Sequence, residues 1–183
     1  MLDQEVIKLR ATSPFSRKNQ LMRVLWILIE GSLFRWSPRP LHIWRSFLLK
    51  SFGAKIGKGV HIYSGVRCWA PWNLEIGEHS GIANGVTLYS QGKIKIGKRC
   101  VISQNSYLCT GSHNYNTPEY KLFTKPIEIG SDCWLAADVF VHPGVSIADG
   151  VIVGARSVVV GDLPSWSVCV GNPCNFKKKR EKY

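Results

Sequence analysis

Several features that assign proteins to common classes are missing from this chain. The six cysteines include no CxxC pair, and no convincing export signal precedes the main part of the sequence. We therefore expect reduced thiols in a cytoplasmic protein, not a disulfide-stabilised secreted one. A strongly apolar stretch, Leu21 to Phe34, is interrupted by Glu30 and Gly31. It is too short to cross a membrane, so no transmembrane helix is expected.

The chain also lacks a basic surface on its central part, although its net charge is +12. Residues 1–55 contain ten Lys and Arg against three Asp and Glu, a net +7, and residues 171–183 contain five against one, a net +4. Residues 56–170 contain nine against eight and are nearly neutral. A nucleic-acid-binding domain more often carries a basic stripe on its folded body. We therefore expect no nucleic-acid partner.

What the sequence does contain is a strict period of six residues between 129 and 165. An aliphatic residue recurs at this spacing, at Ile129, Leu135, Val141, Ile147, Val153 and Val159. Gly or Ala directly follows four of these residues. Three hexads close one triangular coil of about eighteen residues, in which the aliphatic side chains point inward and the backbones of successive coils pair about 4.8 Å apart. The period therefore predicts a parallel β-helix.

The same pattern begins near Ile56 and is interrupted once. Tripeptides that mark equivalent points on successive coils end at Ile76, Ile96 and Ile129. The first two of these isoleucines are 20 residues apart, which is one coil plus two residues, whereas the last two are 33 apart, which is one coil plus fifteen. A loop of about fifteen residues therefore leaves the third coil, and it begins near His113.

Two helices are predicted before the repeat, over 21–34 and about 41–52, with Ser37-Pro38-Arg39-Pro40 between them. In one interpretation they cover the open N-terminal end of the β-helix, where strands would otherwise lie unpaired. In a second interpretation they form a hairpin on an anionic bilayer surface, with tryptophans beside arginines. The residues concerned are Trp26, Trp36, Trp44, Arg35, Arg39 and Arg45. The two interpretations are compatible.

Three short motifs accompany the repeat. The segment Leu108-Cys109-Thr110-Gly111-Ser112-His113 ends the third coil, Trp134 stands in Asp132-Cys133-Trp134-Leu135-Ala136, and Gly171-Asn172-Pro173-Cys174 follows the last coil. In these motifs the chain resembles the hexapeptide-repeat acyltransferases, which have a histidine in a T-x-x-H context, a tryptophan at a hexad start and a closing G-N-P-A motif. With the segments 37–41, 52–57 and 103–113, it looks most like the colanic-acid biosynthesis acetyltransferase branch. The resemblance runs from about residue 13 to the C-terminus.

The resemblance implies an all-β fold, a left-handed parallel β-helix of about five to six coils, with an N-terminal helical segment and a protruding loop near 112–127. It divides the chain into a helical cap or membrane-surface segment at 1–53, a β-helix domain at 54–170 and a basic tail at 171–183. It also implies an acetyl-CoA-dependent O-acetyltransferase that acts on a sugar hydroxyl in exopolysaccharide biosynthesis. The expected assembly is a homotrimer with active sites between neighbouring subunits.

His113 is the candidate general base. Moving an acetyl group from a thioester to a hydroxyl requires removal of the hydroxyl proton, and an imidazole, which titrates near pH 6.5 in model compounds, suits this task. The base can then pass the proton to the departing thiolate, so direct transfer in a ternary complex needs no nucleophilic Ser or Cys. Cys109 is nearby, but nothing in the sequence marks it as activated. The resemblance adds Asn84, one residue after the aligned Ala83, as an oxyanion donor, with a backbone N–H as the alternative.

The resemblance also supplies candidates for substrate binding. It implies that Trp134 lies beside the coenzyme or the acceptor, and that the coenzyme groove is lined by Ala137, Ala155 and Val160. Relatives often carry Thr-Lys at 160–161, so the coenzyme phosphates need another cation here. Arg156 and the tail Lys177-Lys178-Lys179-Arg180 are the candidates, and a solvated, disordered tail is the alternative. The candidates for acceptor contact are Tyr89, Asn105 and Asn114.

Other functions remain open at this point. A different acyl group, or a nucleotide-linked amino sugar as acceptor, fits the same motifs, and a non-catalytic scaffold fits the repeat alone. A β-helical zinc hydratase needs two histidines close in sequence, which His61, His79, His113 and His142 do not supply, so no metal is expected. A lipid-linked acceptor at the inner face of the membrane would explain why the N-terminal helices are basic.

Overall fold

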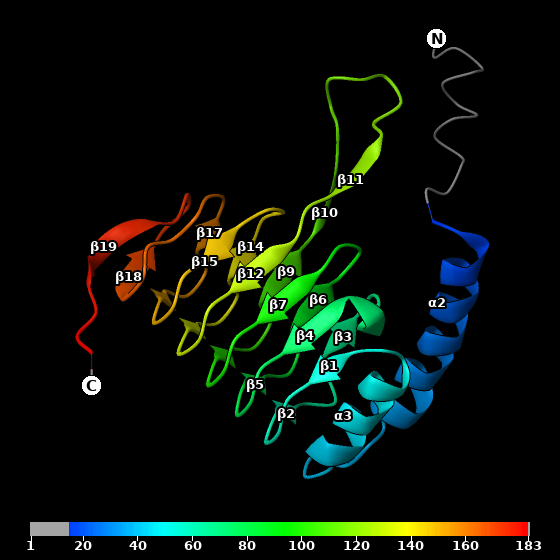
Figure 1. Cartoon of the computed structure of the whole chain (residues 1–183). Coiled ribbons are helices and arrows are strands. Elements are labelled where there is room, and N and C mark those ends of the chain that lie inside the picture. The colour runs from blue at the N-terminus through cyan, green and yellow to red at the C-terminus, as the bar shows by residue number, and fades with distance from the viewer. Residues whose placement is uncertain (1–14, 183) are drawn as a thin grey trace.

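The computed structural model describes residues 15–182, and their main part is a parallel β-helix of about six coils (Figure 1). Each of the first five coils contributes one short strand to each of three faces, and the last coil adds β18 to the second face, where β19 pairs with it. The first face contains β1 (Lys55–Ile56), β4 (Leu74–Ile76), β7 (Ile94–Ile96), β12 (Ile127–Ile129) and β15 (Ser146–Ile147). The second contains β2 (His61–Ile62), β5 (Gly81–Ile82), β8 (Val101–Ile102), β13 (Trp134–Leu135), β16 (Ile152–Val153), β18 (Ser167–Val170) and β19 (Asn175–Lys179). The third contains β3 (Arg67–Cys68), β6 (Thr87–Tyr89), β9 (Tyr107–Cys109), β14 (Phe140–Val141) and β17 (Val158–Val159).

The interior is filled by the aliphatic residues that define the six-residue period. All six of the aliphatic residues predicted to point inward from 129 onward are buried, each at 2% exposure or less. On the first face, Ile76, Ile96 and Ile129 are paired in register, so that equal side chains stack along the axis. The corner after this stack requires glycine, because a Cβ on Gly97 would lie 2.5 Å from the carbonyl carbon of Gly130. The predicted fold is thus confirmed.

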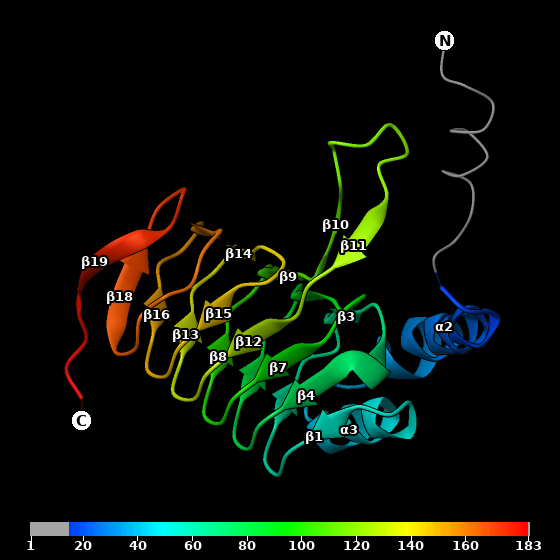
Figure 2. The same cartoon turned by 45° about the horizontal axis from the view of Figure 1, so that its top comes forward.

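Helices cover the N-terminal end of the β-helix (Figure 2). α2 (Arg17–Ile29) continues into a π-helical turn, η1 (Glu30–Phe34), and α3 (His42–Ser51) follows. The first helix begins four residues earlier than predicted, because the Ser16 side chain accepts a hydrogen bond from the Asn19 N–H at 3.2 Å and caps it. No helix within residues 15–182 combines the length and hydropathy needed to span a membrane.

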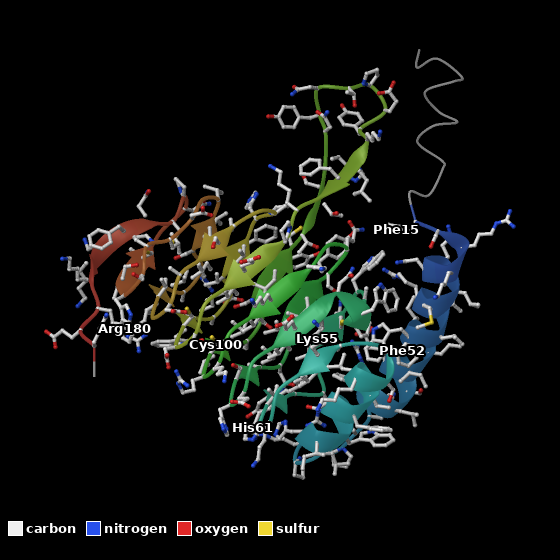
Figure 3. All side chains as sticks on the ribbon, viewed as in Figure 1. Phe15, Phe52, Lys55, His61, Cys100 and Arg180 are labelled. Atoms are coloured by element: carbon white, nitrogen blue, oxygen red, sulfur yellow. The ribbon has the colours of Figure 1, made fainter. Side chains whose placement is uncertain are left out.

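The helices pair with the strand edges that the first coil would otherwise leave open. The Trp26 indole donates to the Cys68 carbonyl at 2.7 Å, and the Cys68 N–H donates to the Glu30 carboxylate at 2.6 Å. Arg45 donates through Nε to the Ile62 carbonyl at 2.5 Å. Phe52 lies between the helices and the first coil, 5.2 Å from the Trp26 ring (Figure 3). These bonds satisfy the backbone of an edge that could pair with another chain.

Burial corrects part of the membrane-hairpin interpretation. Trp26 is 1% exposed and Arg45 is fully buried, so neither side chain is available to a bilayer. Trp36 and Trp44 remain 82% and 37% exposed. The sequence pattern could not distinguish the buried residues from the exposed ones. Arg45 is buried because backbone carbonyls accept its hydrogen bonds, and no acidic residue in the sequence marks it as a buried cation.

Replacing Glu30 with glutamine is expected to reduce the pH dependence of stability. Burial raises the pKa of Glu30, against the opposing effects of the Cys68 N–H bond and of Arg35. The folded state therefore holds this proton more tightly than the unfolded state, so the free energy of unfolding falls as pH rises through the raised pKa. Urea unfolding between pH 4 and about pH 7 measures the slope. Glu128→Gln, at an exposed position on the first face, should keep the wild-type slope, and an equal slope in Glu30→Gln would contradict the assignment.

The two remaining features are a protruding loop and a folded C-terminus. After the third coil, β10 (Gly111–His113) and β11 (Leu122–Thr124) form an antiparallel ribbon at the predicted loop (Figure 1). The tail was expected either to contact phosphates or to be disordered, and it forms β19, antiparallel to β18. Arg180 fixes its end by donating to the carbonyls of Asp132 and Gly150 at 2.7 and 3.0 Å (Figure 3). The disordered alternative is therefore wrong.

Candidate active site

His113 ends β10 and is held in one ring orientation by the facing strand. Its backbone pairs with Leu122, and its Nδ1 lies 2.5 Å from the carbonyl oxygen of Tyr120. A carbonyl can only accept, so Nδ1 carries the proton and Nε2 presents its lone pair. The side chain is exposed. His113 is therefore oriented as an imidazole that can take a proton from a bound hydroxyl.

Cys109 lies just before this histidine but is not activated. Its thiol is half-buried and donates to the Gly111 carbonyl at 3.2 Å. Burial raises the pKa of this thiol, with a smaller opposing effect from the Gly111 bond. A thiol with a raised pKa supplies little thiolate at neutral pH, and the thiolate is the nucleophile. The site thus favours direct transfer over an acyl-cysteine intermediate.

One set of candidates lies along the corner between the third and first faces. Tyr89 ends β6, Val160 follows β17, and the loop that starts at the same corner carries His113 and Asn114. The Tyr89 hydroxyl accepts a hydrogen bond from Gln91 at 2.9 Å. These residues come from three coils and lie along one edge of the three-faced β-helix.

A second set lies along the corner between the second and third faces. It contains Asn84, Asn105, Ala137, Ala155 and Arg156, on coils two to five. The Asn84 Oδ1 accepts the Gly65 N–H at 3.1 Å, which leaves the amide N–H groups of Asn84 as donors. Asn105 and Arg156 have φ values of 60° and 59°, because each corner turns through the left-handed region.

Two further candidates, Trp134 and Lys178, lie on the outside of the second face. Trp134 is 46% exposed, and its indole donates to the Ser103 hydroxyl at 2.9 Å. Strand register places Trp134, Ile152, Val168 and Lys178 in one row across four strands. The folded tail thus brings a lysine onto the same face as the tryptophan, with Trp134 and Lys178 three strand spacings, or about 14 Å, apart.

The two sets are not brought together within one chain. His113, Asn114, Tyr89 and Val160 border one edge of the third face, and the others border its opposite edge or lie beyond it on the second face. A complete site therefore needs either a ligand that crosses the third face or a second copy of the chain. Within residues 15–182, no three His, Cys, Asp or Glu side chains are grouped so that they could hold a metal ion.

Comparison with known proteins decides the family. Residues 126–161 match the family described as "Bacterial transferase hexapeptide (six repeats)". The chain is 48% identical over 166 residues, 91% of each chain, to the Escherichia coli K12 protein named "Putative colanic acid biosynthesis acetyltransferase WcaF". The chain belongs to the hexapeptide-repeat acetyltransferases. The predicted family and enzyme class are thereby confirmed.

Solved hexapeptide-repeat acetyltransferases share the fold along nearly the whole chain. A maltose O-acetyltransferase from Clostridium difficile 630 superposes with a TM-score of 0.85 and 26% identity, covering 98% of this chain and 99% of that one. A hexapeptide-repeat acetyltransferase from Vibrio cholerae O1 biovar eltor, complexed with acetyl coenzyme A, gives a TM-score of 0.84 at 22% identity, with 93% of each chain covered. At this lower identity the second comparison shows the shared fold alone.

Sequence reasoning did not find all the polar residues near these candidates. Arg35 and Arg67 line a hollow together with Asn84 and Asn105, although they come from a helical turn and from the first coil. Neither arginine belongs to a recognisable motif. Arg35 was considered only for membrane contact, and Arg67 lies in the nearly neutral range 56–170, so neither charge pattern revealed the hollow.

Proposed function

We propose that this acetyltransferase moves the acetyl group of acetyl-CoA to a sugar hydroxyl during the assembly of an exopolysaccharide of the colanic-acid type. The observation that carries the proposal is the fixed tautomer of His113, whose Nδ1 is tied to the Tyr120 carbonyl, which leaves Nε2 as the proton acceptor of an exposed side chain. The identity to a relative named for colanic acid biosynthesis supports the choice of acceptor class.

The proposed reaction is a direct transfer. Nε2 of His113 takes the proton of the sugar hydroxyl as its oxygen attacks the thioester carbonyl carbon. The tetrahedral oxyanion is stabilised by the Asn84 amide or by a backbone N–H. The carbon–sulfur bond then breaks, and the proton on the imidazolium passes to the sulfur, which leaves as the free thiol of coenzyme A. Cys109 takes no part.

For the coenzyme we propose the second face and its corner with the third, on the later coils. Ala137 and Ala155 are small, so a ligand can approach the backbone there, and Trp134 offers an exposed ring. Arg156 and Lys178 are both exposed and would face the phosphates. The Arg156 guanidinium is 3.9 Å from the Asp138 carboxylate, a weak exposed pair that a phosphate can replace.

We further propose a homotrimer in which neighbouring copies complete the site. Both candidate sets border the third face, on opposite edges, so a head-to-tail ring would place His113 of one copy against the Asn84 and Trp134 side of the next. Tyr107 and Phe140 stack 5.2 Å apart on this face and offer an aromatic surface to a neighbour.

Mixing two impaired variants is expected to restore activity when acetyl-CoA is limiting. In a shared site, every trimer that contains both His113→Ala and Trp134→Ala subunits has one interface in three with both wild-type residues. Trimers purified through two different tags should therefore recover about a third of the wild-type transfer rate. Mixed oligomers no more active than the separate variants would contradict an active site shared between subunits.

We also propose a cytoplasmic location on the inner face of the membrane, with a lipid-linked acceptor. Exposed apolar side chains lie on α2, on the turn after η1 and on α3, including Leu21, Val24, Leu28, Trp36, Ile43 and Phe47. Exposed basic residues stand among them, namely Arg17, Lys18, Arg39 and Lys50. Apolar side chains flanked by cations suit an anionic bilayer surface.

Vesicle flotation tests this contact. The wild type is expected to float with phosphatidylglycerol vesicles and much less with phosphatidylcholine vesicles, because both charge and apolar burial contribute. Trp36→Asp with Ile43→Asp should abolish flotation, whereas Phe176→Asp, at a 54% exposed position on β19, should not. Equal partitioning of all three proteins would overturn the proposal, and a loss of oligomers in the double variant would assign the patch to a second copy.

Mass spectrometry of a saccharide panel tests the proposed reaction. The panel contains neutral sugars, uronic acids, nucleotide-linked amino sugars and lipid-linked oligosaccharides, each incubated with acetyl-CoA or succinyl-CoA. Acetyl addition to a hydroxyl of a free or lipid-linked saccharide is expected. Modification only of an amino group, or only from the other donor, would replace the proposed function with the alternative acyltransfer.

A further inference from the structure

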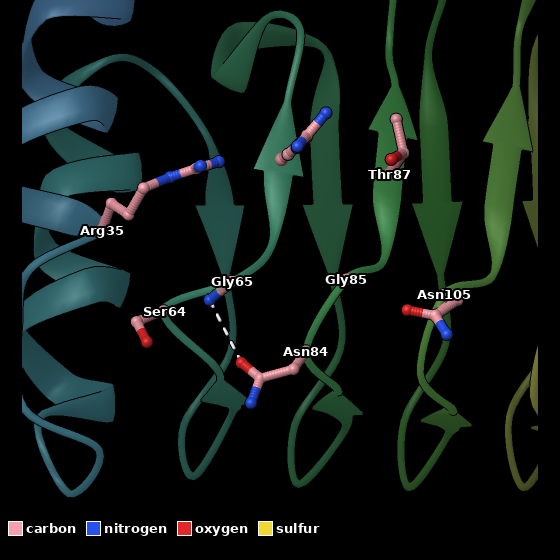
Figure 4. A pocket seen from close by; sticks show the side chains of 8 residues that line it. Arg35, Ser64, Gly65, Asn84, Gly85, Thr87 and Asn105 are labelled. Carbon is pink, nitrogen blue, oxygen red and sulfur yellow. Dashed lines mark hydrogen bonds between the residues drawn. The ribbon is translucent and has the colours of Figure 1, made fainter.

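A hollow of about 520 Å³ lies between the helical cap and the corner of the second and third faces (Figure 4). It is lined by Arg35, Ser64, Gly65, Arg67, Asn84, Gly85, Thr87 and Asn105. The lining includes two arginines and several hydrogen-bonding groups but no carboxylate. The hollow is therefore a positively charged site beside a predicted catalytic residue.

The fold positions both arginines toward this hollow. Arg35 follows η1, and its N–H bonds to the Glu30 carbonyl five residues back at 3.0 Å, the spacing of a π-turn. Figure 4 shows its side chain extending from the helical segment toward the corner strands. Arg67 lies on β3 in register with Thr87 on β6, so both side chains project from the third face. Within residues 15–182, neither guanidinium makes an ion pair or a hydrogen bond.

The neutral groups of the hollow add donors. The Asn84 Oδ1 is engaged by the Gly65 N–H at 3.1 Å, as Figure 4 shows, so its amide N–H groups remain for a ligand. The hydroxyl of Thr87 and the amide of Asn105 complete the lining on the second and third coils. Glu30 attracts both arginines but accepts the Cys68 N–H at 2.6 Å, and burial raises its pKa. It does not line the hollow, which therefore keeps its positive charge.

We infer that this hollow binds an oxyanion carried by the acceptor, a carboxylate or a phosphate close to the acetylated sugar. Two guanidinium groups with amide and hydroxyl donors match the geometry and charge of such a group, which a neutral sugar lacks. The inference rests on the proposed function, because Asn84 links the hollow to the reaction. The coenzyme phosphates are a poorer match, since the residues proposed for them lie on coils four to six and the hollow spans coils one to three.

Calorimetric titration of the full-length protein with glucuronate, glucose 1-phosphate and glucose tests the inference. One of the anionic sugars should bind saturably, and glucose should not. The sugar that binds distinguishes a uronic acid from a sugar phosphate. Arg35→Gln and Arg67→Gln should each weaken that binding about tenfold or more. Lys95→Gln removes an exposed cation on the first face, across the β-helix from the hollow, and should leave the binding unchanged.

Acetyl-CoA is titrated into the same proteins, and circular dichroism confirms that each is folded. If the anionic sugars bind all variants equally, or fail to bind a wild type that binds acetyl-CoA, the hollow is not an oxyanion site. Weaker acetyl-CoA binding in the hollow variants would assign it to the coenzyme and also overturn the inference. Anion binding without any acetyl-CoA binding would instead count against the proposed function alone.

Discussion

Replacing His113 with alanine is expected to lower the rate of acetyl transfer about 10²- to 10⁴-fold, the range that general bases contribute. The imidazole has its Nδ1 fixed by the Tyr120 carbonyl, so the variant loses the only proton acceptor proposed for the acceptor hydroxyl. Acetyl-CoA binding should change little, because the proposed coenzyme contacts lie on the second face and its corner. Release of the coenzyme A thiol measures transfer, and calorimetry measures binding.

A matched histidine variant separates chemistry from structure. His79 is exposed at a corner of an early coil with φ of 59°, which asparagine tolerates, so His79→Asn should retain the wild-type rate. If His113→Ala loses transfer and acetyl-CoA binding together, the histidine is structural. A rate within about threefold of the wild type would remove His113 from the mechanism.

Replacing Arg45 with alanine is expected to lower the free energy of unfolding by about 3 kcal/mol or more. Its guanidinium is fully buried and donates to the carbonyls of Ile62, Pro38 and Arg39, the latter two at 2.9 and 2.6 Å. Truncation removes a donor from each of these carbonyls, leaves that of Arg39 without a partner, and opens a cavity between α3 and the first coil. Urea unfolding followed by circular dichroism measures the loss.

Lys50→Ala provides the control for this helix. Lys50 is exposed in the last turn of α3, so its removal should change the free energy of unfolding by less than about 0.5 kcal/mol. Arg45→Met should be less destabilising than Arg45→Ala but still less stable than the wild type, because methionine fills the cavity and restores no donor. If Arg45→Met is as stable as the wild type, the hydrogen bonds to the cap contribute nothing and the account of the N-terminal end is wrong.

The solenoid could be predicted from the sequence because its physical cause is local and repeated. Almost every strand buries an aliphatic residue at the same point of its hexad, so the period is visible at residues such as Leu135 and Val153 without knowledge of any partner. The position of the His113 loop followed from the same arithmetic, since an insertion shows as a break in the period. The tautomer of the His113 side chain could not be predicted, because it depends on the Tyr120 carbonyl across an antiparallel ribbon.

The ends of the chain could be predicted only in part. Hydropathy marked the N-terminal helices but could not show that Trp26 and Arg45 turn inward to cap strand edges. The charge of the lysine-rich tail allowed either phosphate contact or disorder, whereas its backbone pairs with β18 and Arg180 is held by two carbonyls. The Arg35 and Arg67 hollow was missed because its members come from separate segments that meet only when the cap docks.

The most direct test of whether this chain uses acetyl-CoA as its acetyl donor is calorimetric titration of acetyl-CoA into the folded wild-type protein and into Trp134→Ala. It requires no knowledge of the acceptor. We expect saturable binding near one site per chain in the wild type, and binding weakened about tenfold or more when the exposed indole is removed. A folded, oligomeric wild type that binds no acetyl-CoA would contradict the account.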